Sequence, residues 1–185
     1  MKLIALAALS GMFVAGPAAA QDAAPPFKPS QNPVTDSVVQ RLARDGKFLA
    51  ASADLMPADK YGFKPTPAQM SFGQLVVHVV QTNVYLCSAI GGLQPDVAVF
   101  KLSDAAPKAT LVADIRKSIE VCAQALAKTT DASLGEEVAL MGRGTGQFRA
   151  SAMVTIAADW ADHYSTAAAY LRLNGILPPS APPAK

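Results

Sequence analysis

Four stretches of the chain carry apolar residues at the spacing of an amphipathic helix. The first begins at Thr35 or Asp36, either of which can cap a helix, and continues to about Leu55. Met56-Pro57 ends it. The positions that repeat with a period near 3.6 residues are Val38, Leu42, Phe48, Leu49 and Ala53.

Three further helices are predicted by the same periodicity. One covers about 71–90, with Ser71 as its cap and Gly91-Gly92 at its end. The next covers about 107–128, and its apolar stripe is Leu111, Ile115, Ile119, Cys122 and Leu126. The last covers about 147–173 and ends at Asn174-Gly175.

No useful length of the chain alternates as a strand would, so the pattern predicts an all-α fold, a four-helix bundle. The connections at 56–70, 91–107 and 129–146 are longer than those of a bundle with tight loops. The glycine-rich letters GRGTG at 142–146 follow no predicted strand, so we expect a mobile loop there rather than a phosphate site.

The N-terminus has the layout of a cleavable signal peptide. Lys2 is followed by a short apolar run to Val14, by Gly16-Pro17 and by the small residues Ala18–Ala20. We therefore expect a signal peptide at 1–20, cleavage after Ala20, and export to the periplasm or the medium. The run is too short and too broken to serve as a stable membrane anchor.

Composition then limits the domain organisation and the partners expected for the chain after residue 20. We expect a flexible, proline-rich leader at 21–34, a helical domain at 35–177 and a flexible tail at 178–185. Without residues 1–20 the chain has about 165 residues, which suits one domain with one core. Its 15 Lys and Arg face 14 Asp and Glu, and this balance gives no reason to expect a nucleic-acid partner.

Cys87 and Cys122 are the two cysteines of the chain. An even number of cysteines in an oxidising compartment allows a disulfide. Since neighbouring helices lie about 8–10 Å apart, a bridge between them requires a close crossing. The alternative is a pair of buried, inert thiols.

The two histidines provide the candidate chemistry. Asp159 and His163 are four residues apart, so both side chains project from one face of the last helix. His78, on the second predicted helix, would supply a third ligand and leave positions open for water or substrate. Such a site suits zinc, iron or nickel. The alternative is an ordinary helix pair worth about 0.2–0.5 kcal/mol.

Two separated segments resemble the DinB-like superfamily. The first is 61–78, YGFKPTPAQMSFGQLVVH, and the second is 163–180, HYSTAAAYLRLNGILPPS; the stretch Asn83–Ser88 resembles exported members. The resemblance implies up-down-down-up wiring and a metal site of three histidines, one on the second helix and an H-x-x-x-H pair on the fourth. His78 and His163 match two of them, and Asp159 stands where the third is expected.

The resemblance also implies a function class. Known activities of the superfamily include thiol-dependent transfer and isomerisation assisted by a metal, and members commonly form homodimers. Because an exported chain meets little of the cytosolic thiol pool, we expect an exported protein with a divalent metal site, a metal-dependent transferase or hydrolase of a small-molecule substrate. The alternatives are a non-catalytic metal- or ligand-binding module and a structural or partner-binding bundle with a degenerate site.

Overall fold

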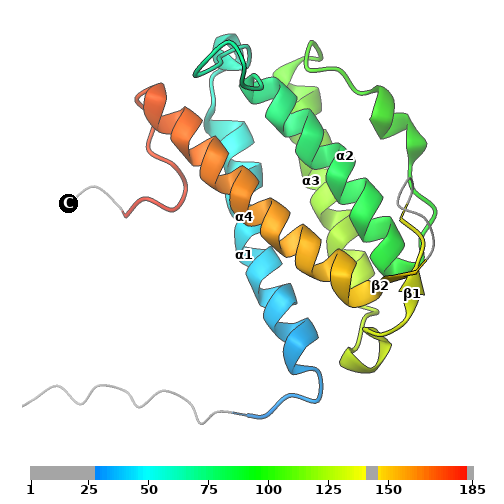
Figure 1. Cartoon of the computed structure of the whole chain (residues 1–185). Helices are drawn as coiled ribbons and strands as arrows, with labels where there is room; N and C mark the ends of the chain where they lie inside the picture. Colours follow the sequence, from blue (N-terminus) through cyan, green and yellow to red (C-terminus); the bar gives the residue numbers. More distant parts are fainter. Residues whose placement is uncertain (1–27, 141–145, 183–185) are drawn as a thin grey trace, which may run out of the picture.

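A computed structural model describes residues 28–140 and 146–182 of the chain. The signal peptide at 1–20, its cleavage point and the first half of the leader, 21–27, lie outside the described residues, as does most of the GRGTG segment. Four long helices dominate the described part: α1 Pro33–Leu55, α2 Phe72–Gly91, α3 Lys108–Leu126 and α4 Arg149–Leu173 (Figure 1). Among these residues no helix is long and apolar enough to cross a membrane.

The helix ends follow local chemistry. Ser71 Oγ accepts from Gln74 N at 3.1 Å while Gln74 Oε1 accepts from Ser71 N at 2.8 Å, and this reciprocal capping box starts α2. Gly92 ends the same helix with a φ of 62°, a conformation that costs glycine little. The start of α1 differs from the prediction: it lies at Pro33, whose fixed φ suits the first turn, and not at Thr35 or Asp36.

The first turn of α1 is capped from far along the chain. The carboxylate of Asp131 accepts from the backbone N–H groups of Val34 and Thr35, at 3.0 and 2.8 Å. Asn32 Oδ1 in turn accepts from Asp131 N at 3.0 Å. Residues 32–34, assigned to the leader by composition, are therefore part of the folded domain.

Side-chain contacts fix the relative directions of the helices. Asn83 pairs with Ser118 and Cys87 with Cys122, so α2 and α3 run parallel. Gly46 of α1 lies against Trp160 of α4, and further along both helices Phe48 stacks on Tyr164. The helices α1 and α4 therefore also run parallel. The two pairs are antiparallel to each other, which is the expected up-down-down-up bundle (Figure 1).

This wiring requires long connections. Since α2 and α3 run in the same direction, residues 92–107 must return along the length of the bundle, and they include the short helix Val97–Lys101. Residues 127–148 contain a second short helix, Asp131–Ser133, and the two-residue strands β1 Glu137–Val138 and β2 Gln147–Phe148, which pair antiparallel. The sequence pattern predicted no strands, and these are too short to produce a periodicity.

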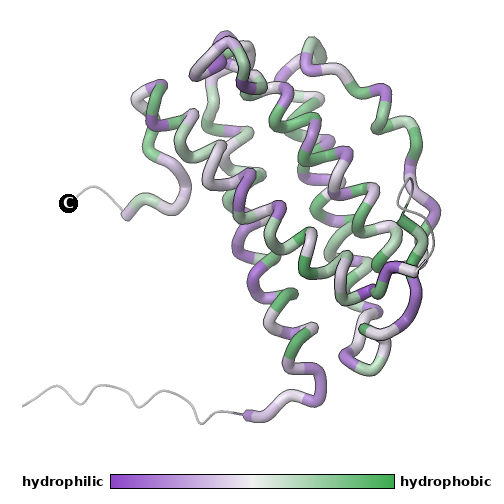
Figure 2. Tube along the Cα trace, in the orientation of Figure 1, coloured by the Kyte–Doolittle hydropathy of each residue, from purple (hydrophilic) through white to green (hydrophobic). Residues whose placement is uncertain are grey.

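The core fills the space between all four helices. Figure 2 shows apolar residues along the inner sides of the helices and polar ones outside. The largest fully buried side chains include Phe72, Met56, Ile90, Leu111, Ile115, Met153, Ile156, Trp160 and Leu171. The disulfide Cys87–Cys122 lies fully buried in this core and joins α2 to α3.

One polar network crosses the core. Trp160 Nε1 donates to Asn83 Oδ1 at 2.5 Å, and Asn83 Nδ2 donates to Ser118 Oγ at 2.9 Å. Ser118 Oγ donates onward to the carbonyl of Ile115 at 2.8 Å. Because buried polar groups are costly unless paired, this network fixes how α4 and α3 sit against α2.

Candidate metal centre

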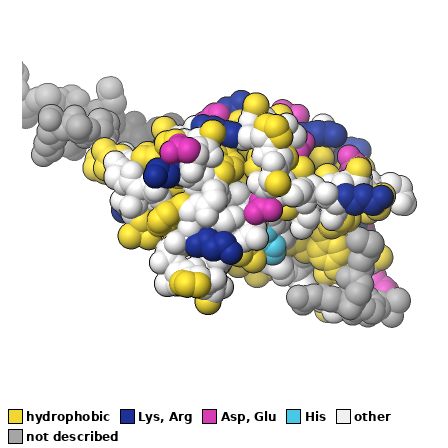
Figure 3. All heavy atoms as spheres, turned by 90° about the horizontal axis from the view of Figure 1, so that it is seen from above, with side chains coloured by type: hydrophobic (Ala, Val, Ile, Leu, Met, Phe, Trp, Pro, Cys, Tyr) yellow, Lys and Arg dark blue, Asp and Glu magenta, His cyan; other side chains and the backbone are white. Residues whose placement is uncertain are grey.

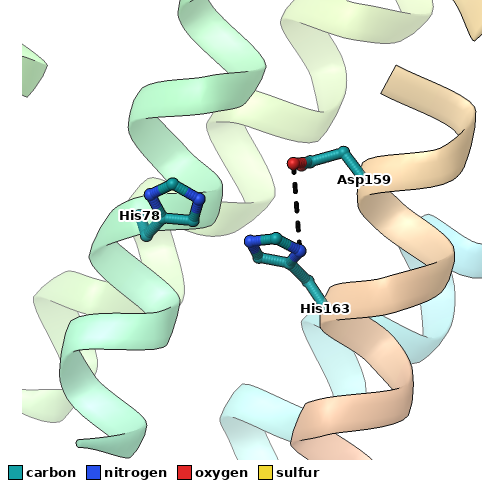
Figure 4. A group of neighbouring side chains, drawn as sticks. All are labelled: His78, Asp159 and His163. Atoms are coloured by element: carbon teal, nitrogen blue, oxygen red, sulfur yellow. Dashed lines mark ion pairs between the residues drawn. The ribbon is translucent and has the colours of Figure 1, made fainter. Parts of the chain in front are cut away.

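Three side chains from two antiparallel helices meet on one side of the core. His78 projects from α2, and Asp159 and His163 project from successive turns of α4 (Figure 4). The hydrogen bond from Trp160 Nε1 to Asn83 Oδ1 joins α4 to α2. Because Trp160 directly follows Asp159, this bond helps to fix the rotation of α4 about its axis and thereby the direction in which Asp159 points. The structure thus brings together all three side chains that the sequence singled out.

The three side chains are close enough to share one ion. One ligand atom from each of them lies within 4.8 Å of the others. The imidazole rings of His78 and His163 are stacked, with centroids 4.8 Å apart and planes inclined by 19°. His163 Nδ1 lies 3.8 Å from Asp159 Oδ1, beyond hydrogen-bonding distance.

The site is mostly shielded from solvent. The side chain of His163 is 13% exposed and that of Asp159 is 16% exposed. The view from above shows histidine atoms reaching the surface beside an acidic side chain (Figure 3). Asp162, on the same helix, is 80% exposed and places its Oδ2 3.7 Å from His163 Nδ1.

Two buried polar atoms of the site have no hydrogen-bond partner among the described residues. They are Asp159 Oδ2 and His163 Nδ1. A buried, unpaired acceptor or donor usually costs about 1–3 kcal/mol, so such atoms require an explanation. A bound cation would pair with a carboxylate oxygen and an imidazole nitrogen at once.

Burial also shifts the acid–base behaviour of the site. Desolvation raises the pKa of Asp159 above its ordinary value, and the nearby imidazoles only partly oppose this. Desolvation lowers the pKa of His78, and the neighbouring His163 lowers it further. His78 is therefore held as a neutral imidazole, which is the form that binds a metal.

A divalent transition metal fits these residues. Two imidazoles and one carboxylate are a donor set typical of zinc, iron and nickel rather than of magnesium or calcium. Ligand atoms around such an ion lie up to about 4 Å apart, since each bond is about 2 Å long. The ligand atoms of the three side chains lie within 4.8 Å of one another, so small side-chain movements would bring them to the separations that a shared ion requires.

Sequence reasoning missed one residue on which the site depends. Asn83 is a buried amide in an apolar helix, and it connects Trp160 to Ser118. A polar side chain in the middle of an apolar stretch was the available signal. Its partners come from two other helices, so the sequence alone could not supply its role.

The comparisons with known proteins agree with this fold. The family model of the DinB superfamily matches residues 41–166, which contain the three side chains and both cysteines. The chain belongs to the DinB superfamily. A search of curated proteins finds no match.

Solved structures show the same fold at low sequence identity. A DinB-like protein from Bacillus cereus superposes with a TM-score of 0.63 at 16% identity, covering 80% of this chain and 97% of the other. A DinB-like protein from Bacillus subtilis gives 0.60 at 18% identity, covering 75% and 92%. A conserved protein from Enterococcus faecalis gives 0.62 at 17% identity, covering 76% and 96%.

Replacing Asp159 by asparagine is expected to change stability in opposite directions without and with metal. Because the folded state raises the pKa of Asp159, the parent loses stability as the pH rises from the ordinary pKa of an aspartate, about 3.9, toward the raised pKa of the folded state. Without metal, Asp159→Asn should therefore be more stable than the parent at pH 7, by on the order of 1 kcal/mol. The gain should shrink as the pH falls toward the ordinary pKa of an aspartate, about 3.9.

With zinc in excess the order should reverse, because a ligand that binds only the folded state stabilises it. Thermal unfolding with chelator and with zinc, at pH 4 and pH 7, measures both effects. Asp162→Asn is the matched control on the same helix turn, since that side chain is solvated. A variant less stable than the parent in chelator at pH 7 would contradict the unpaired state of Asp159.

Proposed function

We propose that this DinB-superfamily protein is exported and binds one divalent transition metal ion, zinc, nickel or iron, through His78, Asp159 and His163. We further propose that it acts on a small molecule as a metal-dependent transferase or hydrolase. The observation that supports the proposal is the meeting of three donor groups within 4.8 Å, two of whose buried atoms have no other partner.

An ion held by three protein ligands keeps a coordination position open, where it lowers the pKa of a bound water or polarises a substrate oxygen. Each residue has a separate task in this arrangement. His78 would bind through a neutral ring, the form that its lowered pKa favours. Asp159 would contribute the single negative charge of the ligand set, next to the two imidazoles.

The decisive measurement is the metal content of protein purified without chelators. We expect about one equivalent of metal per chain in the parent and less than about a tenth of that in His78→Ala and Asp159→Ala, because two ligands rarely retain an ion. Asp162→Ala removes a neighbouring carboxylate from the same helix and should keep the metal. A metal-free parent, or unchanged metal in Asp159→Ala, would refute the ligand assignment.

Turnover divides the catalytic proposal from the binding-only alternative. Hydrolysis of activated esters and amides, and transfer to added thiols, would be followed with the metal-loaded protein and with the chelated one. Turnover that requires the metal and is absent in His78→Ala would support the proposal that the protein is an enzyme. A protein that holds stoichiometric metal and turns over none of these electrophiles is a metal-binding module.

A further inference from the structure

A cavity lies on a different side of α2 from the metal centre. It has a volume of about 400 Å³ and is enclosed by α2, α3 and the connection at 93–102. Figure 1 shows this connection returning beside α2, along the outer side of the pair formed with α3. The volume falls within the range of roughly 300–1,000 Å³ that is usual for small-molecule sites.

The connection that covers this cavity is fixed at two points. Gln81 Nε2 donates to the carbonyl of Val99 at 3.2 Å, which ties the connection to α2. Lys117 Nζ lies 3.6 Å from the carboxylate of Asp96, which ties it to α3. The cavity is therefore bounded by α2, by α3 and by a connection that side-chain contacts fix to both helices.

The interior of the cavity is mostly apolar, and Ser88 and Ser118 add hydroxyl groups to its lining. The apolar lining comprises Val80, Val84, Leu93, Val99, Leu102 and Val121. Ser88 also lines the cavity and is only 3% exposed, and its side chain offers a hydroxyl group that can donate or accept a hydrogen bond. A buried hydroxyl normally finds a partner, so a ligand group that pairs with Ser88 would gain a hydrogen bond.

The charges around the cavity cancel. Lys101 and Lys117 line it together with Asp96 and Asp114, so the formal charge of the four side chains is zero. One of these lysines already pairs with one of the aspartates. Such a rim attracts neither anions nor cations, and it favours a ligand without net charge.

The cavity is separate from the metal centre. All of its lining residues come from α2, α3 and the connection between them, whereas the metal centre requires α4. Val80 follows His78 by two positions, and at about 100° per residue their side chains leave α2 on nearly opposite sides. Binding here therefore does not depend on the metal ligands.

We propose that this cavity binds a small uncharged molecule with an apolar body and one hydroxyl or carbonyl group, which pairs with the Ser88 hydroxyl. The valines and leucines bury the body, and Ser88 sets the orientation. This inference goes beyond the proposed metal-dependent function and stands independently of it.

The test uses displacement of the uncharged fluorophore N-phenyl-1-naphthylamine by 1-naphthol and by naphthalene, with the full mature protein. Val84→Phe places a larger side chain in the cavity and should weaken binding of the fluorophore at least tenfold. Val154→Phe makes the same change at an exposed position on α4 and should have no effect. Equal binding by these two variants would overturn the proposal, as would absence of binding by the parent.

Two further variants separate the parts of the proposal. Ser88→Ala should weaken 1-naphthol by about threefold to tenfold and leave naphthalene unchanged, as expected for one hydrogen bond. His78→Ala should bind both as the parent does, whatever its metal content. Equal effects of Ser88→Ala on the two molecules would refute the role of the hydroxyl.

Methyl NMR covers the case in which Val84→Phe does not fold. Adding 1-naphthol to the parent should shift the methyl signals of Val80, Val84 and Val121 and leave the exposed Val154 unshifted. Shifts confined to valines outside the cavity would overturn the proposal.

Discussion

Replacing Trp160 by alanine is expected to lower the free energy of unfolding by about 3–5 kcal/mol. The side chain is 1% exposed and is the only tryptophan of the chain. It occupies a space against α1 that fits it closely: a Cβ built on Gly46 would lie 2.7 Å from Trp160 Cζ3 and 3.2 Å from Ile119 Cγ2. Removing the indole leaves a large cavity where four helices meet.

The same substitution leaves a buried polar atom unpaired. Asn83 Oδ1 accepts from the indole N–H, and without it the amide oxygen keeps no partner in the core. Trp160→Phe separates the two effects, because it retains most of the ring volume and loses only the hydrogen bond. We expect a cost of about 1–3 kcal/mol for that variant.

Urea unfolding followed by far-ultraviolet circular dichroism measures these losses, since the variants lack the tryptophan needed for fluorescence. Val154→Ala, at an exposed position on the same helix, should change stability by less than about 0.5 kcal/mol. Loss of less than 1 kcal/mol in Trp160→Ala would show that the site collapses around the missing ring. The metal content should also fall in Trp160→Ala, because Asp159 directly precedes Trp160 and its position depends on the packing of that side chain.

Removal of the Cys87–Cys122 disulfide is the second large effect, with an expected loss of about 4 kcal/mol. The bridge joins residues 35 positions apart, and the loop-entropy relation gives this magnitude for a loop of that length. Both residues are fully buried, so the Cys87→Ala, Cys122→Ala double variant also loses packing. The bridge ties together the two parallel helices, which have no short connection to hold them.

Chemical unfolding of the parent, with and without reductant, and of the double variant measures this effect. Single serine variants are unsuitable controls because each would leave a buried thiol, so a double variant at two exposed positions, Ser151→Ala with Ser165→Ala, serves instead. Equal stability of the oxidised and reduced parent would refute the expectation. The intact mass of the purified protein reports the bridge as a loss of two hydrogen atoms, and a chain beginning at Gln21 would support the proposed export.

The sequence predicted the helices well because each one carries its own signals. Apolar residues at helical spacing, the Ser71 capping box and the stops at Gly92 and Gly175 act within a few residues of one another. The start of α1 was placed two or three residues late because Asp131, whose carboxylate accepts from the first turn, lies almost a hundred residues away. The strands β1 and β2 were missed because two residues show no period.

The sequence by itself also selected the metal-ligand candidates. Asp159 and His163 share a helix face by spacing alone, and His78 is the one other histidine. Only the tertiary structure decided that α2 and α4 pack antiparallel with these residues at the same level, and that Asp159 Oδ2 and His163 Nδ1 are buried without partners. The reason is physical: spacing sets the direction of a side chain on its own helix, whereas helix packing sets what that side chain meets.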